Sequence, residues 1–315
     1  MKKKAVFLVG FGNPKSSSVY DIWSFLKEIL SDKAIKGYLP AGRFSPKWLI
    51  GLAAFIRAIK LRKAYASLWT PTGHRQVVEA IQVTGELQKR LGDDCPVHYC
   101  SLYGEPSFDE LCKKIDSEAY SKVIVIPLFP HYSYPTTSTI FEIALKRLSA
   151  TTQIRFCPNF HTNQNFINLF VEAAKQYDLS SYDSICFSFH SLPLKALLYS
   201  PNYEADCKKT SLNIAKALNI PSYDVVFQSK FGKGEWLKPS LKDTIETYGR
   251  SGKKRVAVFS PSFVFSSLET LYEIASCSHN TFLAYGGKSL DFIGPSCDSS
   301  YLVNVLQELC TSCND

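Results

Sequence analysis

Residues 187–193, which read Phe-Ser-Phe-His-Ser-Leu-Pro, place a histidine directly after a candidate buried strand. The apolar run 185–187, followed by small polar residues, is typical of a parallel strand that ends at the catalytic edge of an α/β sheet. His190 would then face a cleft, where a neutral imidazole can accept a proton near neutral pH or bind a metal ion. The alternative is that His190 caps a turn by hydrogen-bonding to the backbone.

A pair of carboxylates follows a second candidate strand. The apolar run 256–259 leads into residues 260–274, which indicate an aromatic loop and then a helix. Glu269 would lie in the first helical turn, where the helix dipole favours an acid, and Glu273 would lie four residues on along the same face. Such a stripe could hold or pass a divalent cation. The alternative is a solvated helix face with a capping acid.

A proline-rich loop with aromatic side chains forms the third feature. Residues 126–137 read Ile-Pro-Leu-Phe-Pro-His-Tyr-Ser-Tyr-Pro-Thr-Thr, between a strand at 123–128 and a helix from about Thr137. Prolines stiffen such a loop, and a stiff aromatic loop at the end of a strand makes a flat apolar wall that suits a large planar ligand. A buried plug of the core is the alternative.

The elements that must position these residues alternate along the chain. Helical patterns separate strand-like runs at residues 5–10, 97–100, 123–128, 154–157, 184–188, 225–228, 256–260 and 281–284. This alternation predicts an α/β protein with two Rossmann-like halves, each a parallel sheet flanked by helices. We expect a first domain at 1–150, a second at 151–298 and a last helix, 299–315, that packs back on the first domain.

Composition narrows the function classes. The 315 residues include 36 Lys and Arg against 28 Asp and Glu, and this mildly basic balance could attract an anionic ligand. The basic residues are scattered and accompany no nucleic-acid-binding motif, so nucleic acid is not expected as a partner. Gly10-Phe-Gly12 lacks the third glycine of a dinucleotide-binding turn. With no apolar run of about 18 residues and no secretory signal, the ten cysteines are expected to be reduced thiols of a cytoplasmic protein.

Short stretches in a shared order carry a resemblance to a known family. They are residues 8–14, 29–32, 65–69, 103–107, 126–137, 190–193, 228–232, 235–237 and 268–271. On these stretches the chain resembles the ferrochelatase family, bacterial type, whose members are lyases that insert Fe²⁺ into a porphyrin in haem biosynthesis.

This resemblance implies a chelatase-like fold and assigns roles to the candidate residues. His190 and Glu269 would be the catalytic and metal-binding pair, with His190 accepting a pyrrole proton. Glu273 would extend a path for metal entry or proton exit. Phe11 and Tyr65 are candidate porphyrin contacts. Fe²⁺ is a substrate in this reaction, and no cofactor is expected.

The chain departs from some relatives at several positions. Phe11 replaces a tyrosine that can touch the metal, and Ser267 replaces a histidine two residues before the glutamate. Some ferrochelatases carry a [2Fe-2S] cluster on C-terminal cysteines, and Cys310-Thr-Ser-Cys313 supplies half of such a set. A further ligand position in the proline-rich loop holds Tyr134 instead, so a cluster is not expected.

The resemblance leaves the tetrapyrrole open. Protoporphyrin IX, converted to protohaem, is favoured because a tyrosine at the place of Phe11 tends to accompany the coproporphyrin-type enzymes. The alternatives are a coproporphyrin ferrochelatase, a cobalt chelatase of a related tetrapyrrole, and a non-catalytic haem- or porphyrin-binding protein. The apolar helix expected at 44–60, flanked by positive charge, could form a lip beside the cleft and meet the inner face of the membrane, or be a core helix.

Overall fold

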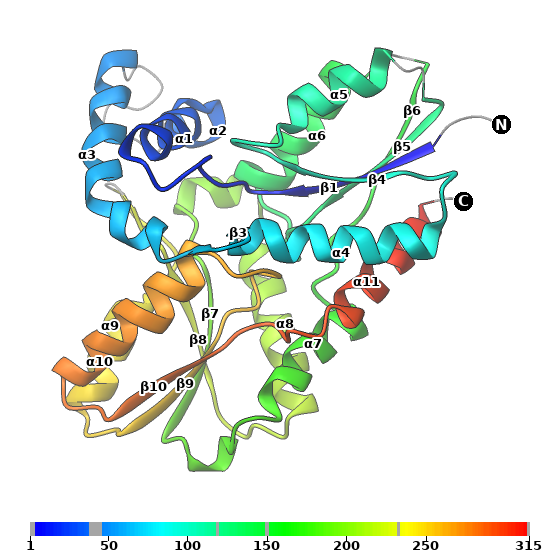
Figure 1. Cartoon of the computed structure of the whole chain (residues 1–315). Coiled ribbons are helices and arrows are strands. Elements are labelled where there is room, and N and C mark those ends of the chain that lie inside the picture. The colour runs from blue at the N-terminus through cyan, green and yellow to red at the C-terminus, as the bar shows by residue number, and fades with distance from the viewer. Residues whose placement is uncertain (1–3, 38–45, 118–119, 149–150, 232–233, 314–315) are drawn as a thin grey trace. The chain divides into compact units, whose positions relative to one another are not determined.

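The computed structural model describes residues 4–37, 46–117, 120–148, 151–231 and 234–313. The chain divides into two compact units, the first made of Met1–Asn159 with Val303–Asp315 and the second of Phe160–Leu302. Each unit has its own parallel sheet (Figure 1).

The first unit is built on a four-stranded sheet in the order β4-β1-β5-β6. Its strands are β1 (Lys4–Gly10), β4 (Val97–Ser101), β5 (Lys122–Pro127) and β6 (Gln153–Phe156). All neighbouring pairs are parallel. The central strands β1 and β5 are buried along nearly their whole length, which explains why both read as continuous apolar runs. A short antiparallel pair, β2 (Trp69–Thr70) with β3 (Gly73–His74), directly precedes the helix that begins at Arg75.

Two helices of the first unit, α1 (Val19–Ser31) and α2 (Lys33–Lys36), begin at residues whose side chains cap them. The other helices of this unit are α3 (Lys47–Ala66), α4 (Arg75–Leu91), α5 (Phe108–Ser117), the π-helix η2 (Tyr134–Ser138), α6 (Thr139–Arg147) and most of α11 (Ser300–Ser312). The side chains of Ser18 and Asp32 cap α1 and α2 by accepting hydrogen bonds from backbone N–H groups of the first turn. Helix α3 packs on α1, and the indole N–H of Trp23 donates to the carbonyl of Gly51 at 2.9 Å.

The second unit repeats the plan with the strand order β10-β9-β7-β8. Its strands are β7 (Ser184–His190), β8 (Asp224–Gln228), β9 (Arg255–Phe259) and β10 (Ser289–Ile293), all parallel. Its helices are α7 (Gln164–Ala174), η3 (Leu179–Ser181), η4 (Leu194–Leu198), α8 (Tyr203–Ala217), α9 (Leu241–Arg250), the π-helix η5 (Leu268–Ser278) and α10 (His279–Ala284). Buried side chains of β9, α9 and η5, among them Val258, Ile245 and Ile274, form one side of its core.

One strand prediction is wrong. Residues 281–284 are not a strand; they belong to helix α10, which continues directly from η5. Phe282, within this run, is fully buried in the core that also contains Leu290. The edge strand is β10, Ser289–Ile293, which follows Gly286 and Gly287. Tertiary packing therefore overrides the local β propensity of residues 281–284.

The predicted fold class is confirmed, because both units are parallel sheets flanked by helices. The helix expected at 44–60 is present as α3, although Phe44 and Ser45 lie outside the described residues. In the part of the chain that the structure describes, no helix is both long enough and apolar enough to cross a bilayer.

Candidate active site

His190 is the last residue of β7 and is held mainly through its backbone. Its amide donates to the hydroxyl of Ser262 at 3.2 Å, and its carbonyl accepts the hydroxyl of Tyr203 at 2.8 Å. The ring Nδ1 lies 2.8 Å from the carbonyl oxygen of Ser191. A carbonyl can only accept, so Nδ1 carries the proton and, in the neutral ring, Nε2 carries the lone pair. The capping alternative therefore holds for one ring nitrogen and leaves the other for proton or metal chemistry.

The π-helix η5 carries both glutamates. Ser267 caps it, because the hydroxyl of Ser267 accepts from the amide of Thr270 at 3.3 Å and the hydroxyl of Thr270 accepts from the amide of Ser267 at 2.9 Å. Glu269 lies in the first turn, where the helix dipole favours a carboxylate. Glu273 accepts a hydrogen bond from the hydroxyl of Ser229. Both glutamates are half-buried, and imidazole with carboxylate is a donor set that suits Fe²⁺.

Gln228 connects the histidine with the glutamate helix. It is the register partner of His190 in the β7–β8 pair, and its carbonyl accepts the amide of Ser191 at 2.8 Å. The side-chain Nε2 of Gln228 donates to the carbonyl of Glu269 at 3.2 Å. Gln228, at the end of β8, thus contacts both the end of β7, where His190 lies, and the first turn of η5. No role was predicted for Gln228 from the sequence. The feature that could have indicated one is a polar residue at the end of an apolar strand.

Phe11 and Tyr65 belong to one aromatic cluster in the first unit. Phe11 makes edge contacts with Phe25 and Tyr103, at ring-centroid distances of 6.4 and 5.2 Å. Tyr65 contacts the same Phe25 ring at 6.4 Å. Phe11 is half-buried, whereas Tyr65 is only 5% exposed. Phe11 is therefore the better placed of the two to touch a ligand, and Tyr65 supports the cluster through its contact with Phe25.

Gly12 allows the loop that holds Phe11 to lie against its neighbour. The carbonyls of Gly10 and Phe11 accept the amides of Leu102 and Tyr103 at 2.9 and 3.0 Å. Gly12 has a φ of +103°, and a Cβ atom there would lie 1.8 Å from the carbonyl oxygen of Tyr103. Only glycine tolerates both this backbone conformation and this approach.

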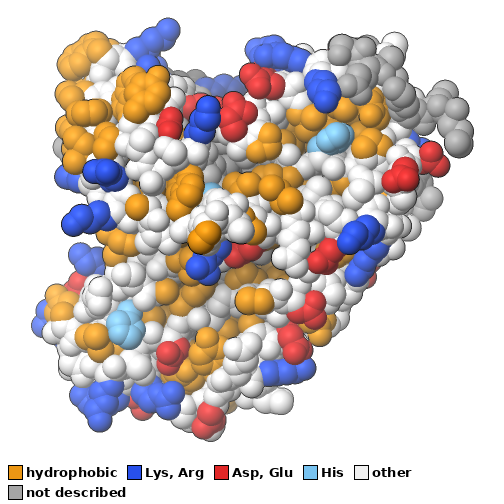
Figure 2. Space-filling model, viewed as in Figure 1, with side chains coloured by type: hydrophobic (Ala, Val, Ile, Leu, Met, Phe, Trp, Pro, Cys, Tyr) orange, Lys and Arg blue, Asp and Glu red, His pale blue; other side chains and the backbone are white. Residues whose placement is uncertain are grey.

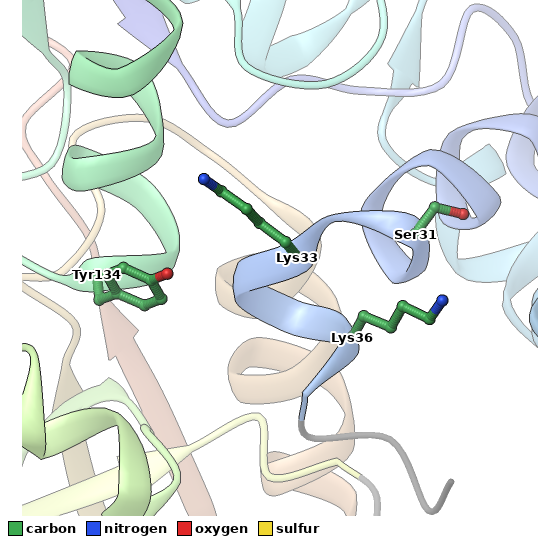
Figure 3. Close-up of a pocket in the computed structure, with 4 residues that line it drawn as sticks. All are labelled: Ser31, Lys33, Lys36 and Tyr134. Carbon is green, nitrogen blue, oxygen red and sulfur yellow. The ribbon is translucent and has the colours of Figure 1, made fainter. Parts of the chain in front are cut away.

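A pocket in the first unit is lined by Ser31, Lys33, Lys36 and Tyr134 and has a volume of about 500 Å³ (Figure 3). Lys33 forms an ion pair with Glu142, which neutralises one of the two cations. The remaining Lys36 makes the pocket suited to an anionic group such as a carboxylate. Tyr134, which the sequence places in the proline-rich loop, is thus beside α2.

The C-terminal cysteines lie in a buried thiol group. The sulfur of Cys313 is 2.8 Å from that of Cys157, and both side chains are buried. Burial raises the pKa of Cys310 to about 12 and holds the pKa of Cys157 well above its ordinary value. The ligands of a [2Fe-2S] cluster are thiolates, and no step of the reaction is assigned to such a cluster. Across the described ranges, no three or more His, Cys, Asp or Glu side chains group to hold a metal ion.

The arrangement of two parallel-sheet units is that of the chelatase fold. A structure of SirB from Bacillus subtilis with Fe³⁺ matches 98% of this chain and 97% of its own, with a TM-score of 0.55 and 10% identity. The sirohydrochlorin chelatase SirB from Bacillus subtilis subspecies spizizenii, in complex with cobalt, matches 99% and 96%, with a TM-score of 0.54 and 12% identity. At these identities the likeness shows the fold alone.

Sequence comparison is more specific. The ferrochelatase family model matches residues 3–313. The coproporphyrin III ferrochelatase of Lactococcus lactis subsp. cremoris (strain SK11) is 31% identical over 98% of this chain and 96% of its own length. The ferrochelatase of Dechloromonas aromatica (strain RCB) is 32% identical over 92% of this chain and 82% of its own length. The chain belongs to the ferrochelatase family, lyases that insert a metal ion into a porphyrin, and the predicted family is confirmed.

Proposed function

We propose that the protein inserts Fe²⁺ into a porphyrin with His190 and Glu269 as the catalytic and metal-binding pair. The observation that carries this assignment is the 2.8 Å contact between Nδ1 of His190 and the carbonyl of Ser191. This contact fixes the tautomer, so that Nε2 is the atom that accepts a proton. Catalytic imidazoles are commonly oriented in this way by a backbone carbonyl.

The reaction exchanges two pyrrole protons for one metal ion. In a flat free-base ring the nitrogens point inward, so a bent ring exposes their lone pairs and lies closer to the transition state. Nε2 of His190 takes a proton as an N–H bond of the ring breaks, and Fe²⁺ forms bonds to the ring nitrogens. Glu269 binds Fe²⁺ or takes the second proton. Glu273, four residues further along η5, extends the carboxylate path by which metal enters or a proton leaves.

The ring is held by apolar contacts and by its carboxylates. Phe11 supplies an aromatic contact, supported by Tyr65 through the shared neighbour Phe25. The pocket beside Lys36 offers a cation for a carboxylate at the edge of the ring.

Coproporphyrin III is the ring that we infer first. A relative with that name is 31% identical over 98% of this chain and 96% of its own length. Coproporphyrin carries four carboxylates, which also agrees with the excess of basic residues. Protoporphyrin IX, with two carboxylates and protohaem as its product, is the second candidate because Phe11 replaces the tyrosine associated with the coproporphyrin enzymes.

We also propose that the protein is cytoplasmic and that it touches a membrane surface through α3. This helix exposes Trp48, Leu52, Phe55 and Ile59, which follow one stripe of the helix. Figure 2 shows hydrophobic side chains gathered over α3 with Lys and Arg side chains beside them. An exposed apolar stripe flanked by positive charge suits an anionic lipid surface and would give a poorly soluble ring a short path to the site.

An anaerobic insertion assay tests the proposal. Fe²⁺ is added to the protein with coproporphyrin III or protoporphyrin IX, and the absorbance change of the ring is followed. We expect insertion into one ring at a clearly higher kcat/KM. If the protein binds both rings but inserts neither Fe²⁺ nor Co²⁺, the proposed enzyme activity is rejected and a porphyrin carrier is favoured.

A further inference from the structure

The end of strand β8 makes two side-chain contacts with the helix that carries both glutamates. Gln228 donates to the carbonyl of Glu269 at 3.2 Å, and the next residue, Ser229, donates to the carboxylate of Glu273. One contact is to the backbone of the first turn of η5 and the other is to a side chain one turn later. Together they fix both the position and the rotation of the helix relative to the strand.

The amide of Gln228 is locked in one orientation. The hydroxyl of Ser188 donates to its Oε1 at 2.6 Å, which leaves Nε2 to donate to Glu269. Ser188 is fully buried and Gln228 is 4% exposed, so water does not compete for these groups. A buried amide that is satisfied at both ends is rigid, and its loss leaves a buried polar group unpaired.

The same residue also holds the histidine. Its backbone carbonyl accepts the amide of Ser191, and the carbonyl of Ser191 in turn accepts Nδ1–H of His190. The main chain of Gln228 therefore supports His190, while its side chain supports Glu269. The first support is independent of residue type, but the second requires a side chain with an acceptor and a donor on one group.

Ser229 has a backbone conformation that suits this function. Its φ of +63° lies in the left-handed region, which is unusual for a residue other than glycine or asparagine. Glycine would fit this position with less strain but would lose the hydroxyl that reaches Glu273. Strained residues of this kind gather at functional sites.

We propose that Gln228 and Ser229 are positioning residues for metal insertion, which hold Glu269 and Glu273 at a fixed distance from His190. The inference rests on the proposed function of these three residues. Gln228 acts on the helix backbone and so on the turnover step, whereas Ser229 acts on a carboxylate of the metal path and so on the capture of Fe²⁺.

The kinetic test uses Gln228→Glu and Ser229→Gly. A carboxylate at position 228 keeps the size of the side chain and can still accept from Ser188, but it cannot donate to Glu269. We expect kcat to fall roughly 10–100-fold, as for other partners that orient metal ligands, with the porphyrin KM within about twofold of wild type. Ser229→Gly should raise the KM for Fe²⁺ several-fold and change kcat less. Gln176→Glu, an exposed residue in the same unit, makes the same charge change and should have no effect.

Hydrogen exchange of residues 268–278 provides a readout that is independent of turnover. Gln228→Glu should speed exchange in the first turn of η5, and Gln176→Glu should not. Ser188→Ala keeps the amide but releases its orientation, and it should give an intermediate effect even if Gln228→Glu fails to fold. Unchanged exchange in η5 together with unchanged kcat would overturn the positioning role. If the wild-type protein inserts no metal and the exchange is still altered, Gln228 holds the helix η5 in place, but the proposed function is rejected.

Discussion

The residues that are proposed to hold the ring and those proposed to do chemistry are positioned by different physics. In the first unit, Phe11 is placed by aromatic edge contacts and by close backbone approach at Gly12. In the second unit, His190 and Glu269 are placed by hydrogen bonds that run through Gln228. A wall for a planar ligand needs shape, which packing supplies. A proton acceptor needs a defined tautomer and direction, which hydrogen bonds supply.

The largest expected effect on the packed region comes from Gly12→Ala. A Cβ atom would lie 1.8 Å from the carbonyl of Tyr103 in a left-handed backbone conformation, so the loop must move. We expect a loss of about 4 kcal/mol in the free energy of unfolding, measured by urea denaturation. Gly92→Ala is the matched control, because Gly92 also has a positive φ of +78° but no atom near the added Cβ. Equal losses for the two variants would show that backbone conformation, and not close approach, accounts for the effect.

A buried histidine of the first unit, His74, should make the stability of the protein depend on pH. His74 is 5% exposed, neither ring nitrogen has a partner among the described residues, and burial lowers its pKa to about 4. The unfolded chain takes up a proton near pH 6.5, which folded His74 resists until about pH 4. The free energy of unfolding should be unaffected above pH 6.5 and fall by roughly 3 kcal/mol between pH 6.5 and 4.

His74→Leu removes this titration and should flatten the stability loss in that window. Urea denaturation at pH 7 and at pH 4.5 measures the difference. A loss on acidification that is as steep in His74→Leu as in wild type would mean that other groups carry it.

A smaller effect is expected where the packed wall meets the ligand. Phe11→Ala should raise the KM for porphyrin about tenfold and leave kcat little changed, because it removes an aromatic contact that is present throughout the reaction. Phe11→Tyr, which keeps the ring, should restore binding. A fall in kcat with an unchanged KM in Phe11→Ala would contradict the assignment of ring binding to the first unit and of chemistry to the second.

The smallest effect on stability is expected on α3. Phe55 and Ile59 are 47% and 54% exposed, so replacing both with serine should change the free energy of unfolding by no more than about 0.5 kcal/mol each. The same variant should lose binding to vesicles that contain anionic lipid, measured by co-sedimentation. Ile81→Ser on α4, at 60% exposure, is the control. Vesicle binding that survives the α3 changes would remove the membrane contact from the proposal.

The sequence predicted the elements that a local pattern encodes and missed what tertiary contacts decide. Buried strands such as β1, β5 and β7 read directly as apolar runs, and His190 was placed at a strand end by the small polar residues around it. Residues 281–284 were misassigned because the burial of Phe282 in a helix depends on partners distant in sequence. The role of Gln228 could not be read from the chain, since it depends on a parallel pairing with His190 and on the register of η5.

The same limit applies within the candidate site. The positive φ of Ser229 is a backbone property, and the contact of His190 Nδ1 with the carbonyl of Ser191 depends on the local backbone geometry. A pattern of residue types in the sequence reveals neither. The sequence left two alternatives for α3, a lip beside the cleft or a core helix. An apolar helix pattern alone does not say which face is covered, and the structure exposes one stripe of the helix.

The most direct test of the account is the insertion of Fe²⁺ by His190→Ala compared with His279→Ala. His279 lies in the same unit, is also half-buried, and also holds its Nδ1 2.9 Å from a backbone carbonyl, that of Leu290. Porphyrin binding is measured by fluorescence quenching in the same samples. We expect His190→Ala to bind the ring and to lose at least about 100-fold in kcat, and His279→Ala to retain near wild-type turnover. Wild-type turnover in His190→Ala, or equal losses in both variants, would contradict the assignment of His190 as the proton acceptor.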